Sequence, residues 1–556
     1  MSRNGARVWQ QRCSSTQYQR GRISGMSRTV ELPERCRLRM RSLGLRRVVT
    51  LTAWVVILAN PLPIPAFAGG EQDIQTTTPI PQQIEAQPAS TPSLILEPGS
   101  VAFPIPFTMA PSTLEQAGEM QVASDSPNGG TSENNNDDEP KRRALPAPLD
   151  DIFPSSEYLG PTPLIGVPDT DPVYPLTKAL WSAFPTLKKA RIKVYGWANF
   201  GVNASTSGKS NIPESYATVP NQIELDQGVL RIERGPDTVQ TDHVDWGFRL
   251  SSMYGMDYRW TTSQGWFSGQ LLHHNYLYGF DPVEAYGLLY IPSVAKGMVI
   301  KVGRYISPPD IEAQLAPDNY LYTHSLMFTY DCYTQTGINA AIKLNDQWSV
   351  LFGIHAGDDI APWNGAAHPT AMAMVRWVAA SNNDSLYGGI DSLNGGSFKD
   401  GHDNLQQFNL TWTHRFNQQG TFLTSTEAYY LFQTHALVGG TVNNGPPHTW
   451  FTNVGAGAPI PGNAPAFGVV NYTELKFSKK DFLSLRPVDY IVDFKGERSG
   501  FATTMASWTA GVTHRFNELI SVRPEVRYEH AFSARPWDNG QRKDQFMFAI
   551  DALLRF

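Results

Sequence analysis

The sequence predicts an all-β protein, a closed antiparallel transmembrane β-barrel of about 16 strands, within a range of about 12 to 18, that follows a disordered N-terminal segment. Three observations lead to this prediction. Strand-like alternation recurs along residues 191–556, short and long connections follow one another in turn, and the chain ends on an alternating strand. A mean hydropathy of −0.31 with 11% aromatic residues suits a wall that is apolar on one side only.

Residues 1–68 have the features of an export signal. An arginine-rich stretch precedes an apolar run over residues 48–59, and the triplet Ala66-Phe67-Ala68 follows it. A small–x–small triplet is typical of a signal-peptidase site, so we expect cleavage after Ala68. The preface before Met40 is longer than a signal peptide needs. We expect that Met40 is the true start, with a simply extended n-region as the alternative.

The cysteines and the net charge narrow the class of protein further. Cys13 and Cys36 lie in the expected signal segment, which leaves Cys332 alone in the mature chain. An intramolecular disulfide is then impossible, although an exported protein could form one. The net charge of −6 is modest, and no basic block suggests a nucleic-acid partner.

Two segments separate the export signal from the predicted barrel. Residues 69–175 are rich in Pro, Gln, Thr, Ser and acidic residues, a composition that cannot bury enough apolar surface to offset the entropy of ordering. We interpret them as a disordered linker, with a tether to peptidoglycan or to a partner as the functional alternative. Residues 176–190 resemble a short amphipathic helix, which would lie either at the membrane surface or in the barrel mouth.

Residues 191–556 contain the predicted strands. In residues 192–204 the apolar positions fall on one face and Lys193, Tyr195 and Asn199 fall on the other. Residues 348–356 and 407–416 repeat this pattern, and strand 385–391 is the weakest of the series. Alternation with a period of two is typical of a sheet with one apolar and one polar face. Repeated along the whole region, it indicates a barrel wall between lipid and water.

The connections give independent support. Tight polar turns, such as Asn345-Asp346-Gln347 and Asn517-Glu518, alternate with longer loops. This asymmetry is typical of outer-membrane barrels, which have short periplasmic turns and long outer loops. A barrel of about 16 strands leaves an aqueous channel instead of a packed interior. The expected long loops lie near residues 206–221, 256–281, 306–331, 357–370, 392–405, 436–465, 495–502 and 532–544.

The C-terminal strand, QFMFAIDALLRF (545–556), places apolar residues at every second position and ends on Phe556. A soluble β-sandwich can also end on an alternating strand. In a bacterial outer-membrane barrel, however, the last strand is read by the barrel-assembly machinery. We therefore expect Phe556 to act as an insertion signal, and we expect contact with outer-membrane lipid.

Several segments resemble the β-barrel porin-2 (OmpL-like) family. They include KVYGWANFGVNAST (193–206), KGMVIKVGRYISPPDIE (296–312) and VRPEVRYEHA (522–531). The resemblance spans essentially all of residues 191–556 and implies a bacterial outer-membrane porin. The stretch Arg486-Pro487-Val488-Asp489-Tyr490 is one residue longer than the family pattern, which predicts a β-bulge at Pro487.

In a porin the functional side chains lie on the inward face, because a charged side chain that faces lipid destabilises the barrel. We expect a water-filled channel for passive diffusion of small hydrophilic solutes and ions. Charges of both signs would face the lumen and influence ion selectivity. The expected pore-lining residues are Lys193, Arg231, Glu233, Arg249, Lys301, Lys343, Glu427, Arg523, Glu525, Arg527, Glu529, Asp551 and Arg555.

The loop 306–331 is the third long outer loop. In general porins the third long loop folds into the barrel, and the resemblance implies the same for this loop. It contains the candidate constriction residues Asp310, Glu312 and Asp318. We expect these carboxylates to face cations of the wall, and an outward cap is the alternative. The candidate wall cations are Arg523, Arg527, Arg231 and Arg249.

The sequence contains no recognisable catalytic motif, and we expect neither an enzyme nor a cofactor or metal site. Outer-loop carboxylates such as Asp358-Asp359 could hold Ca²⁺, but that pattern is unspecific. The alternative function is a non-conducting surface adhesin or a structural membrane-anchor barrel. A homo-oligomer is compatible with either function.

Overall fold

The computed structural model describes residues 165–166, 174–213, 216–308, 311–381, 383–399, 401–417, 420–439 and 458–556. The expected signal peptide, Met40 and nearly all of the expected linker lie outside these ranges. Among the described residues, no helix is both long and apolar enough to span a bilayer.

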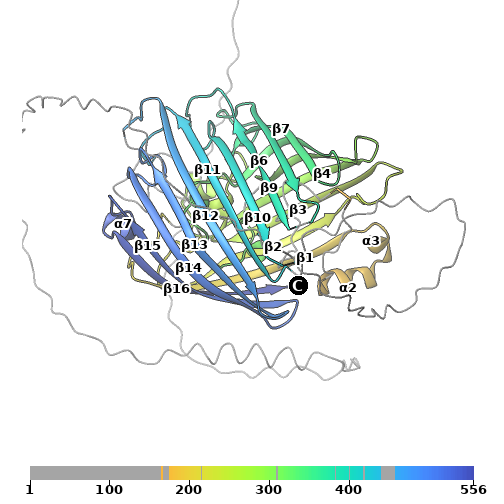
Figure 1. The fold of residues 1–556 in the computed structure, drawn as a ribbon, viewed down its shortest axis with the longest axis horizontal. Coiled ribbons are helices and arrows are strands. Elements are labelled where there is room, and N and C mark those ends of the chain that lie inside the picture. The colour runs from red at the N-terminus through yellow and green to blue at the C-terminus, as the bar shows by residue number, and fades with distance from the viewer. Residues whose placement is uncertain are drawn as a thin grey trace, which may run out of the picture. The chain divides into compact units, whose positions relative to one another are not determined.

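Sixteen antiparallel strands close into one barrel, which confirms the predicted fold class (Figure 1). Each strand pairs with its neighbours in the chain, and β1 pairs with β16 to close the ring. The strands are β1 (Lys193–Ser205), β2 (Ile223–Arg234), β3 (Asp245–Gly255), β4 (Gly279–Ile291), β5 (Met298–Ile306), β6 (Thr334–Lys343), β7 (Trp348–Asp358), β8 (Thr370–Val378), β9 (Asp384–Leu393), β10 (Gln406–Arg415), β11 (Phe422–Thr434), β12 (Asn463–Lys476), β13 (Asp481–Asp493), β14 (Thr503–Arg515), β15 (Ile520–Ala531) and β16 (Asp544–Arg555).

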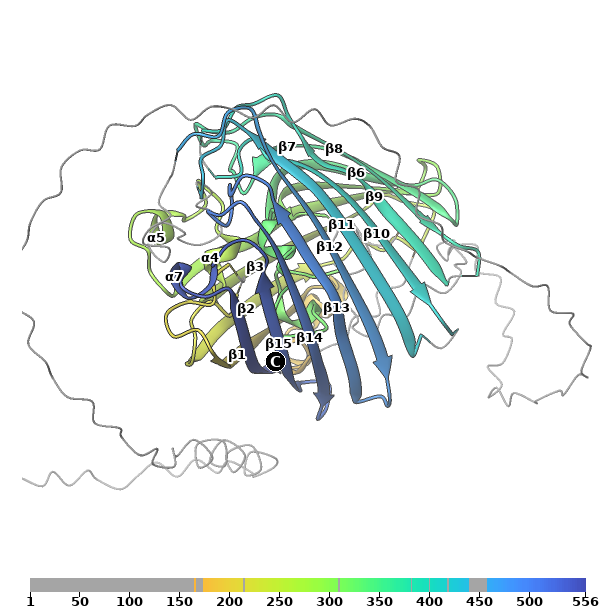
Figure 2. The same cartoon turned by 60° about the vertical axis from the view of Figure 1, so that its left-hand side comes forward.

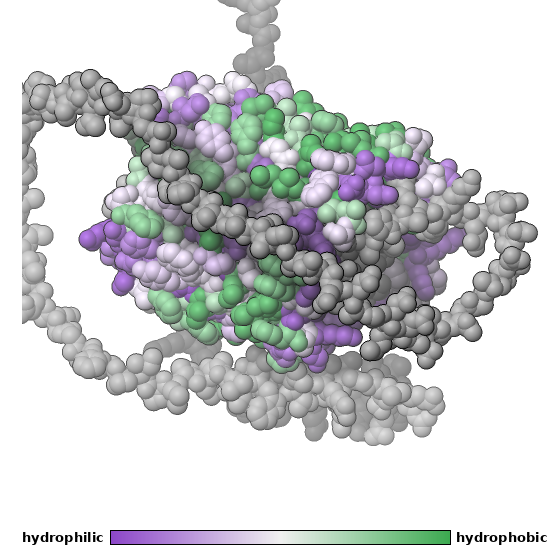
Figure 3. Space-filling view, viewed as in Figure 1, coloured by the Kyte–Doolittle hydropathy of each residue, from purple (hydrophilic) through white to green (hydrophobic). Residues whose placement is uncertain are grey.

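The wall is apolar outside and polar inside, the reverse of a soluble protein. Along β7, the side chains of Phe352 and Ile354 are each 53% exposed, whereas that of His355, the next residue, is buried. Large apolar side chains are exposed on most strands, and Figure 3 shows hydrophobic residues in green patches on the wall. A closed ladder with this outer surface satisfies every strand edge without water, as a bilayer requires.

The strands are strongly tilted and lie side by side, as Figure 2 shows for β10 to β15. Their connections alternate in length as expected. The turns 344–347, 477–480 and 516–519 lie at one edge, and the loops 256–278 and 307–333 lie at the other. β1 begins and β16 ends at the short-turn edge, which is the periplasmic edge of an outer-membrane barrel.

Two short helices precede β1 where the sequence predicts a single helix over 176–190. They are α2 (Pro175–Ala183) and α3 (Pro185–Lys189). Phe184 between them has φ −131° and ψ 82°, because a residue that precedes proline disfavours the helical conformation. The Thr177 hydroxyl donates to the Val194 carbonyl over 2.6 Å, so α2 is held at the start of β1.

The loops contain further short helices. They are α4 (Tyr258–Thr261), α5 (Gly269–Leu272), the 3₁₀ turns η1 (Ala316–Asp318) and η2 (Phe328–Tyr330), and α7 (Trp537–Gly540).

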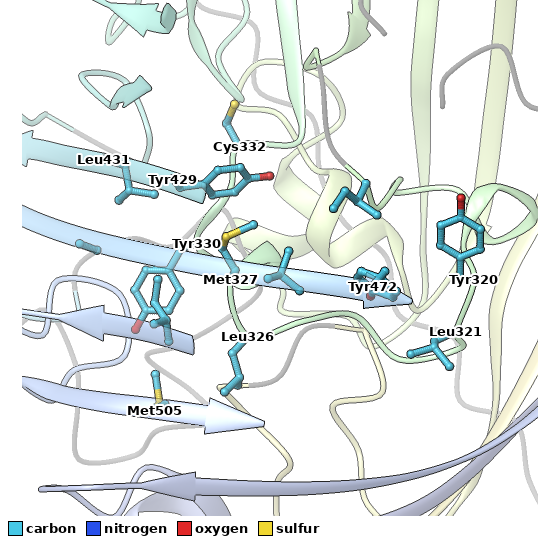
Figure 4. Packing of buried hydrophobic residues seen from close by; sticks show 14 of the residues in the cluster. Tyr320, Leu321, Leu326, Met327, Tyr330, Cys332, Tyr429, Leu431, Tyr472 and Met505 are labelled. Atoms are coloured by element: carbon cyan, nitrogen blue, oxygen red, sulfur yellow. The ribbon is translucent and has the colours of Figure 1, made fainter. Parts of the chain in front are cut away.

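The loop between β5 and β6 lies inside the barrel. We call its described residues, 307–308 and 311–333, the inward loop. Nearly all of them are buried. Figure 4 shows Leu326 and Met327 of this loop among Tyr472 of β12 and Met505 of β14, which belong to one hydrophobic cluster. The main apolar core of this protein is therefore the contact between the inward loop and the inner wall of the barrel.

Barrel closure generates a prediction about Phe556. Its amide donates to the Gly196 carbonyl over 2.9 Å, and its side chain is 42% exposed on the outer face. A charge at this position would face lipid, whereas Arg555 is on the inward face, so Phe556→Asp should strongly reduce the folded barrel and Arg555→Asp should reduce it much less. The measurement is the amount of heat-modifiable protein in outer membranes. Equal levels of the two variants would contradict this role of Phe556.

Candidate functional site

The thirteen expected pore-lining residues occupy inward positions of the wall. Arg555 is partly exposed and the others are buried. In this barrel, burial of a charged strand residue means that it faces the interior, because the alternate positions carry the exposed apolar side chains. The lumen is thus lined by charges of both signs.

Many of these charges form ion pairs within the wall. Arg249 Nε lies 2.8 Å from Glu233 Oε2, and Arg231 Nη2 lies 2.7 Å from Glu284 Oε2. On the other side of β1, Arg523 Nε of β15 donates to Asp551 Oδ1 of β16 over 3.0 Å. Such charge-assisted pairs offset part of the cost of removing each charge from water.

Sequence reasoning did not identify Arg304 and Asp281 as site residues. Arg304 Nη1 lies 2.6 Å from Asp281 Oδ1, and both side chains are buried. Each shares its strand with a second buried charge three positions away, Lys301 in β5 and Glu284 in β4. Strict alternation places residues three positions apart on opposite faces, so it selects only one charge of each pair for the lumen.

Wall carboxylates bind the backbone amides of the inward loop. Glu525 Oε2 accepts from the Tyr322 amide over 2.8 Å, and Asp489 Oδ2 accepts from the Leu326 amide over 2.8 Å. On another strand, Glu427 Oε2 accepts from the Ile311 amide over 2.9 Å. These carboxylates satisfy amides that are buried and outside any ladder or helix.

Wall arginines bind the carbonyls of the same loop. Arg523 Nη1 donates to the Ala316 and Asn319 carbonyls over 2.9 and 2.7 Å, and Arg486 Nη1 donates to the Thr323 carbonyl over 2.9 Å. Arg527 donates to the His324 carbonyl. Carboxylates for amides and guanidinium groups for carbonyls together hold the loop against β11 to β15.

The expected pairing of loop carboxylates with Arg523, Arg527, Arg231 and Arg249 is wrong for Glu312. Its nearest cation is Arg486, with Nη1 3.6 Å from Oε1, and Tyr472 donates its hydroxyl proton to Oε1 over 2.7 Å. Burial raises the pKa of Glu312, and Arg486 offsets part of that increase. The four expected arginines are instead engaged by wall carboxylates.

The other two constriction candidates are Asp310 and Asp318. Asp310 lies outside the described residues. Asp318 is buried, and the described part of the chain holds no ion pair between it and any of those four arginines.

The predicted β-bulge in β13 is confirmed. The pairing of β13 with β14 shifts register between Arg486 and Tyr490, around Pro487. Because one residue is added within the bulge, Arg486 and Asp489 are both buried on the inner side although an odd number of positions separates them. Strict alternation places them on opposite faces, so the pattern alone cannot assign both of them to the lumen.

The inward charges are divided along the barrel axis. Acidic residues predominate in the outer half and basic residues in the periplasmic half. The exceptions are Arg304 and Arg527 in the outer half and Glu233, Asp245, Glu427, Glu474 and Asp551 in the periplasmic half. The outer acidic residues are Glu224, Asp226, Asp281, Asp358, Asp391, Asp493 and Glu529. The periplasmic basic residues are Lys193, Arg231, Arg249, Lys301, Lys343, Arg376, Arg415, Arg515 and Arg555.

The loop contacts predict the effect of removing one acceptor. Glu525→Ala should leave the Tyr322 and Thr323 amides buried without a partner, at a cost of about 1–3 kcal/mol. Hydrogen exchange of these amides should accelerate by at least about 5-fold, the equivalent of about 1 kcal/mol. Glu529→Ala is the matched control on the same face of β15, because Glu529 pairs with Arg527 and Gln545. Equal protection in both variants would rule out this anchoring role of Glu525.

Comparison with known proteins identifies the family. The family model described as "Putative beta-barrel porin-2, OmpL-like" matches residues 191–556, more than half of the chain and the whole of the barrel. A search of curated proteins finds no matching sequence.

Solved porin structures match this chain at low sequence identity. The anion-selective porin from Comamonas acidovorans is 9% identical with a TM-score of 0.42, and the comparison covers 66% of this chain and 99% of that one. OmpT of Vibrio cholerae and the outer membrane channel DcaP of Acinetobacter baumannii are each 10% identical with a TM-score of 0.39, covering 66% of this chain and 97% of theirs. The family assignment rests on the match to the family model: this chain belongs to the β-barrel porin-2 (OmpL-like) family of bacterial outer-membrane porins.

Proposed function

We propose that this porin conducts small hydrophilic solutes and ions past a constriction formed by the inward loop. The observation that carries the proposal is the attachment of this loop to wall charges, such as Glu525 and Arg523, by its backbone. A loop bonded at both amides and carbonyls narrows the lumen permanently and excludes large solutes. We propose no catalytic role for the charged side chains, because their bonds are with one another and with the loop.

The axial division of charge supports a second feature of conduction. An acidic outer half concentrates cations and a basic periplasmic half concentrates anions. One sign of the voltage drives cations into the pore from the outer end and anions into it from the periplasmic end, so the concentration of ions in the pore rises. The opposite sign of the voltage drives both kinds of ion out of the pore and lowers the current. We therefore propose that the ionic current through this porin depends on the sign of the voltage.

Reduction of the basic half should weaken this rectification. Lys343→Gln combined with Arg376→Gln removes two inward charges near the periplasmic edge, so the ratio of currents at opposite voltages should fall toward unity and selectivity should shift toward cations. Lys479→Gln with Lys480→Gln removes the same charge from the exposed turn 477–480 and serves as the control. The measurement is the current–voltage curve of single oriented channels in planar bilayers. A symmetric curve for the wild type would refute axial rectification.

Asp257 provides a pH-dependent test of the outer half. Burial raises the pKa of Asp257 to about 7, the hydrogen bond from Gln227 opposes this increase, and Asp551 adds to it. The carboxyl is neutral below that pH and negative above it, so a rise from about pH 6 to about pH 8 should shift the reversal potential toward cation selectivity. Asp257→Asn should reduce this shift, whereas Asp346→Asn on the periplasmic turn should not. The same pH response in Asp257→Asn and the wild type would exclude Asp257 as its source.

The alternative is a non-conducting adhesin or membrane anchor. Single-channel conductance separates the two directly, because a barrel sealed by the inward loop would insert into bilayers without steps of current. The proposed partners are outer-membrane lipid, the barrel-assembly machinery, small hydrophilic solutes and further copies of the chain. Chemical cross-linking in the native membrane tests the last of these.

A further inference from the structure

Three potential metal ligands meet where the inward loop ends. Cys332 is the next-to-last residue of that loop, Asp358 ends β7 and Asp391 lies near the end of β9. One ligand atom from each lies within 4.8 Å of the other two, and Cys332 Sγ is 3.3 Å from Asp391 Oδ2. All three side chains are fully buried.

Two polar atoms at this cluster have no hydrogen-bond partner in the part of the chain that the structure describes. They are Asp358 Oδ2 and His355 Nδ1, both from buried side chains. His355 Nδ1 lies 3.8 Å from Asp358 Oδ1, and His355 Nε2 lies 3.4 Å from Ser392 Oγ.

Among the described residues, no Lys or Arg balances the charges at the cluster. Within the described residues, neither Asp358 nor Asp391 forms an ion pair with Lys or Arg. The Gln335 amide donates to Asp358 Oδ1 over 3.0 Å and to Asp391 Oδ1 over 3.3 Å, but it carries no charge. Two buried carboxyl groups so close together require a shared proton or a bound cation.

We propose that Cys332 Sγ and one carboxylate oxygen each from Asp358 and Asp391 bind a divalent transition metal of the zinc class, with His355 beside Asp358 as a neighbouring group. Zinc accepts sulfur, nitrogen and oxygen ligands in tetrahedral sites, whereas Ca²⁺ and Mg²⁺ select oxygen ligands. Binding releases to water the proton of the Cys332 thiol and any proton held by the two carboxyl groups, because the ligating forms are the thiolate and the carboxylates. The sequence alone gave no expectation of this site, since its ligands come from one loop and two separate strands.

A metal at this position would join the inward loop to β7 and β9. The loop's other bonds described above are with β11 to β15, so the site would fasten its C-terminal end to a different part of the wall. The inference is independent of the proposed function, because the barrel could conduct with or without the metal.

The test is a titration of the purified full-length porin in detergent after treatment with a chelator. Co²⁺ should produce a near-ultraviolet sulfur-to-cobalt charge-transfer band, and Zn²⁺ should remove it by displacement. Cys332→Ser should abolish the band, and Asp391→Asn should weaken Zn²⁺ binding by at least about 10-fold. Glu518→Gln removes an exposed carboxylate from the turn between β14 and β15 and should bind like the wild type.

Heat-modifiable migration establishes that each variant is folded. Should Asp391→Asn fail to fold, Asp358→Asn replaces the other carboxylate and should weaken Zn²⁺ binding while the charge-transfer band persists. The proposal is overturned if the wild type gives no such band, if Cys332→Ser binds Zn²⁺ with wild-type affinity, or if Ca²⁺ binds more tightly than Zn²⁺.

Discussion

The bonding of the inward loop to charged side chains of the wall is the constraint on which the interior of this barrel depends. A loop inside a lumen must satisfy its backbone without a sheet or a long helix. Glu525 and Asp489 accept from its amides, and Arg523 and Arg486 donate to its carbonyls. The apolar side chains of the loop can pack against Tyr472 and Met505 only because these bonds hold its backbone in place.

This arrangement gives the inward charges two tasks. Charges such as Arg523 and Glu525 hold the loop, and their effect on ions in the lumen is reduced by the bonds they make. Charges nearer the periplasmic edge, such as Lys343 at the end of β6 and Arg376 near the end of β8, are better placed to act on ions. The electrostatic character of the passage should therefore depend more on the residues that do not anchor the loop.

Much of the barrel could be predicted from the sequence because its wall obeys one local rule. Alternation placed Lys193 and Glu529 on the inner face, and the lengths of the connections located the loop 306–331. The rule fails at Pro487, where the bulge changes which residues face inward. It also says nothing about partners across the lumen, so neither the Arg486–Glu312 contact nor the meeting of Cys332 with two strands could be foreseen.

The order of charges along β15 has a consequence for how this protein can vary. Arg523 and Arg527 alternate with Glu525 and Glu529, and the inward loop presents carbonyls and amides in a matching order. Exchange of Arg523 with Glu525 would preserve the composition, the net charge and the hydropathy of the strand. It would, however, place a carboxylate against the loop carbonyls and a guanidinium group against the loop amides. Two homologous barrels with identical lumen charge can therefore differ in whether their third outer loop remains inside.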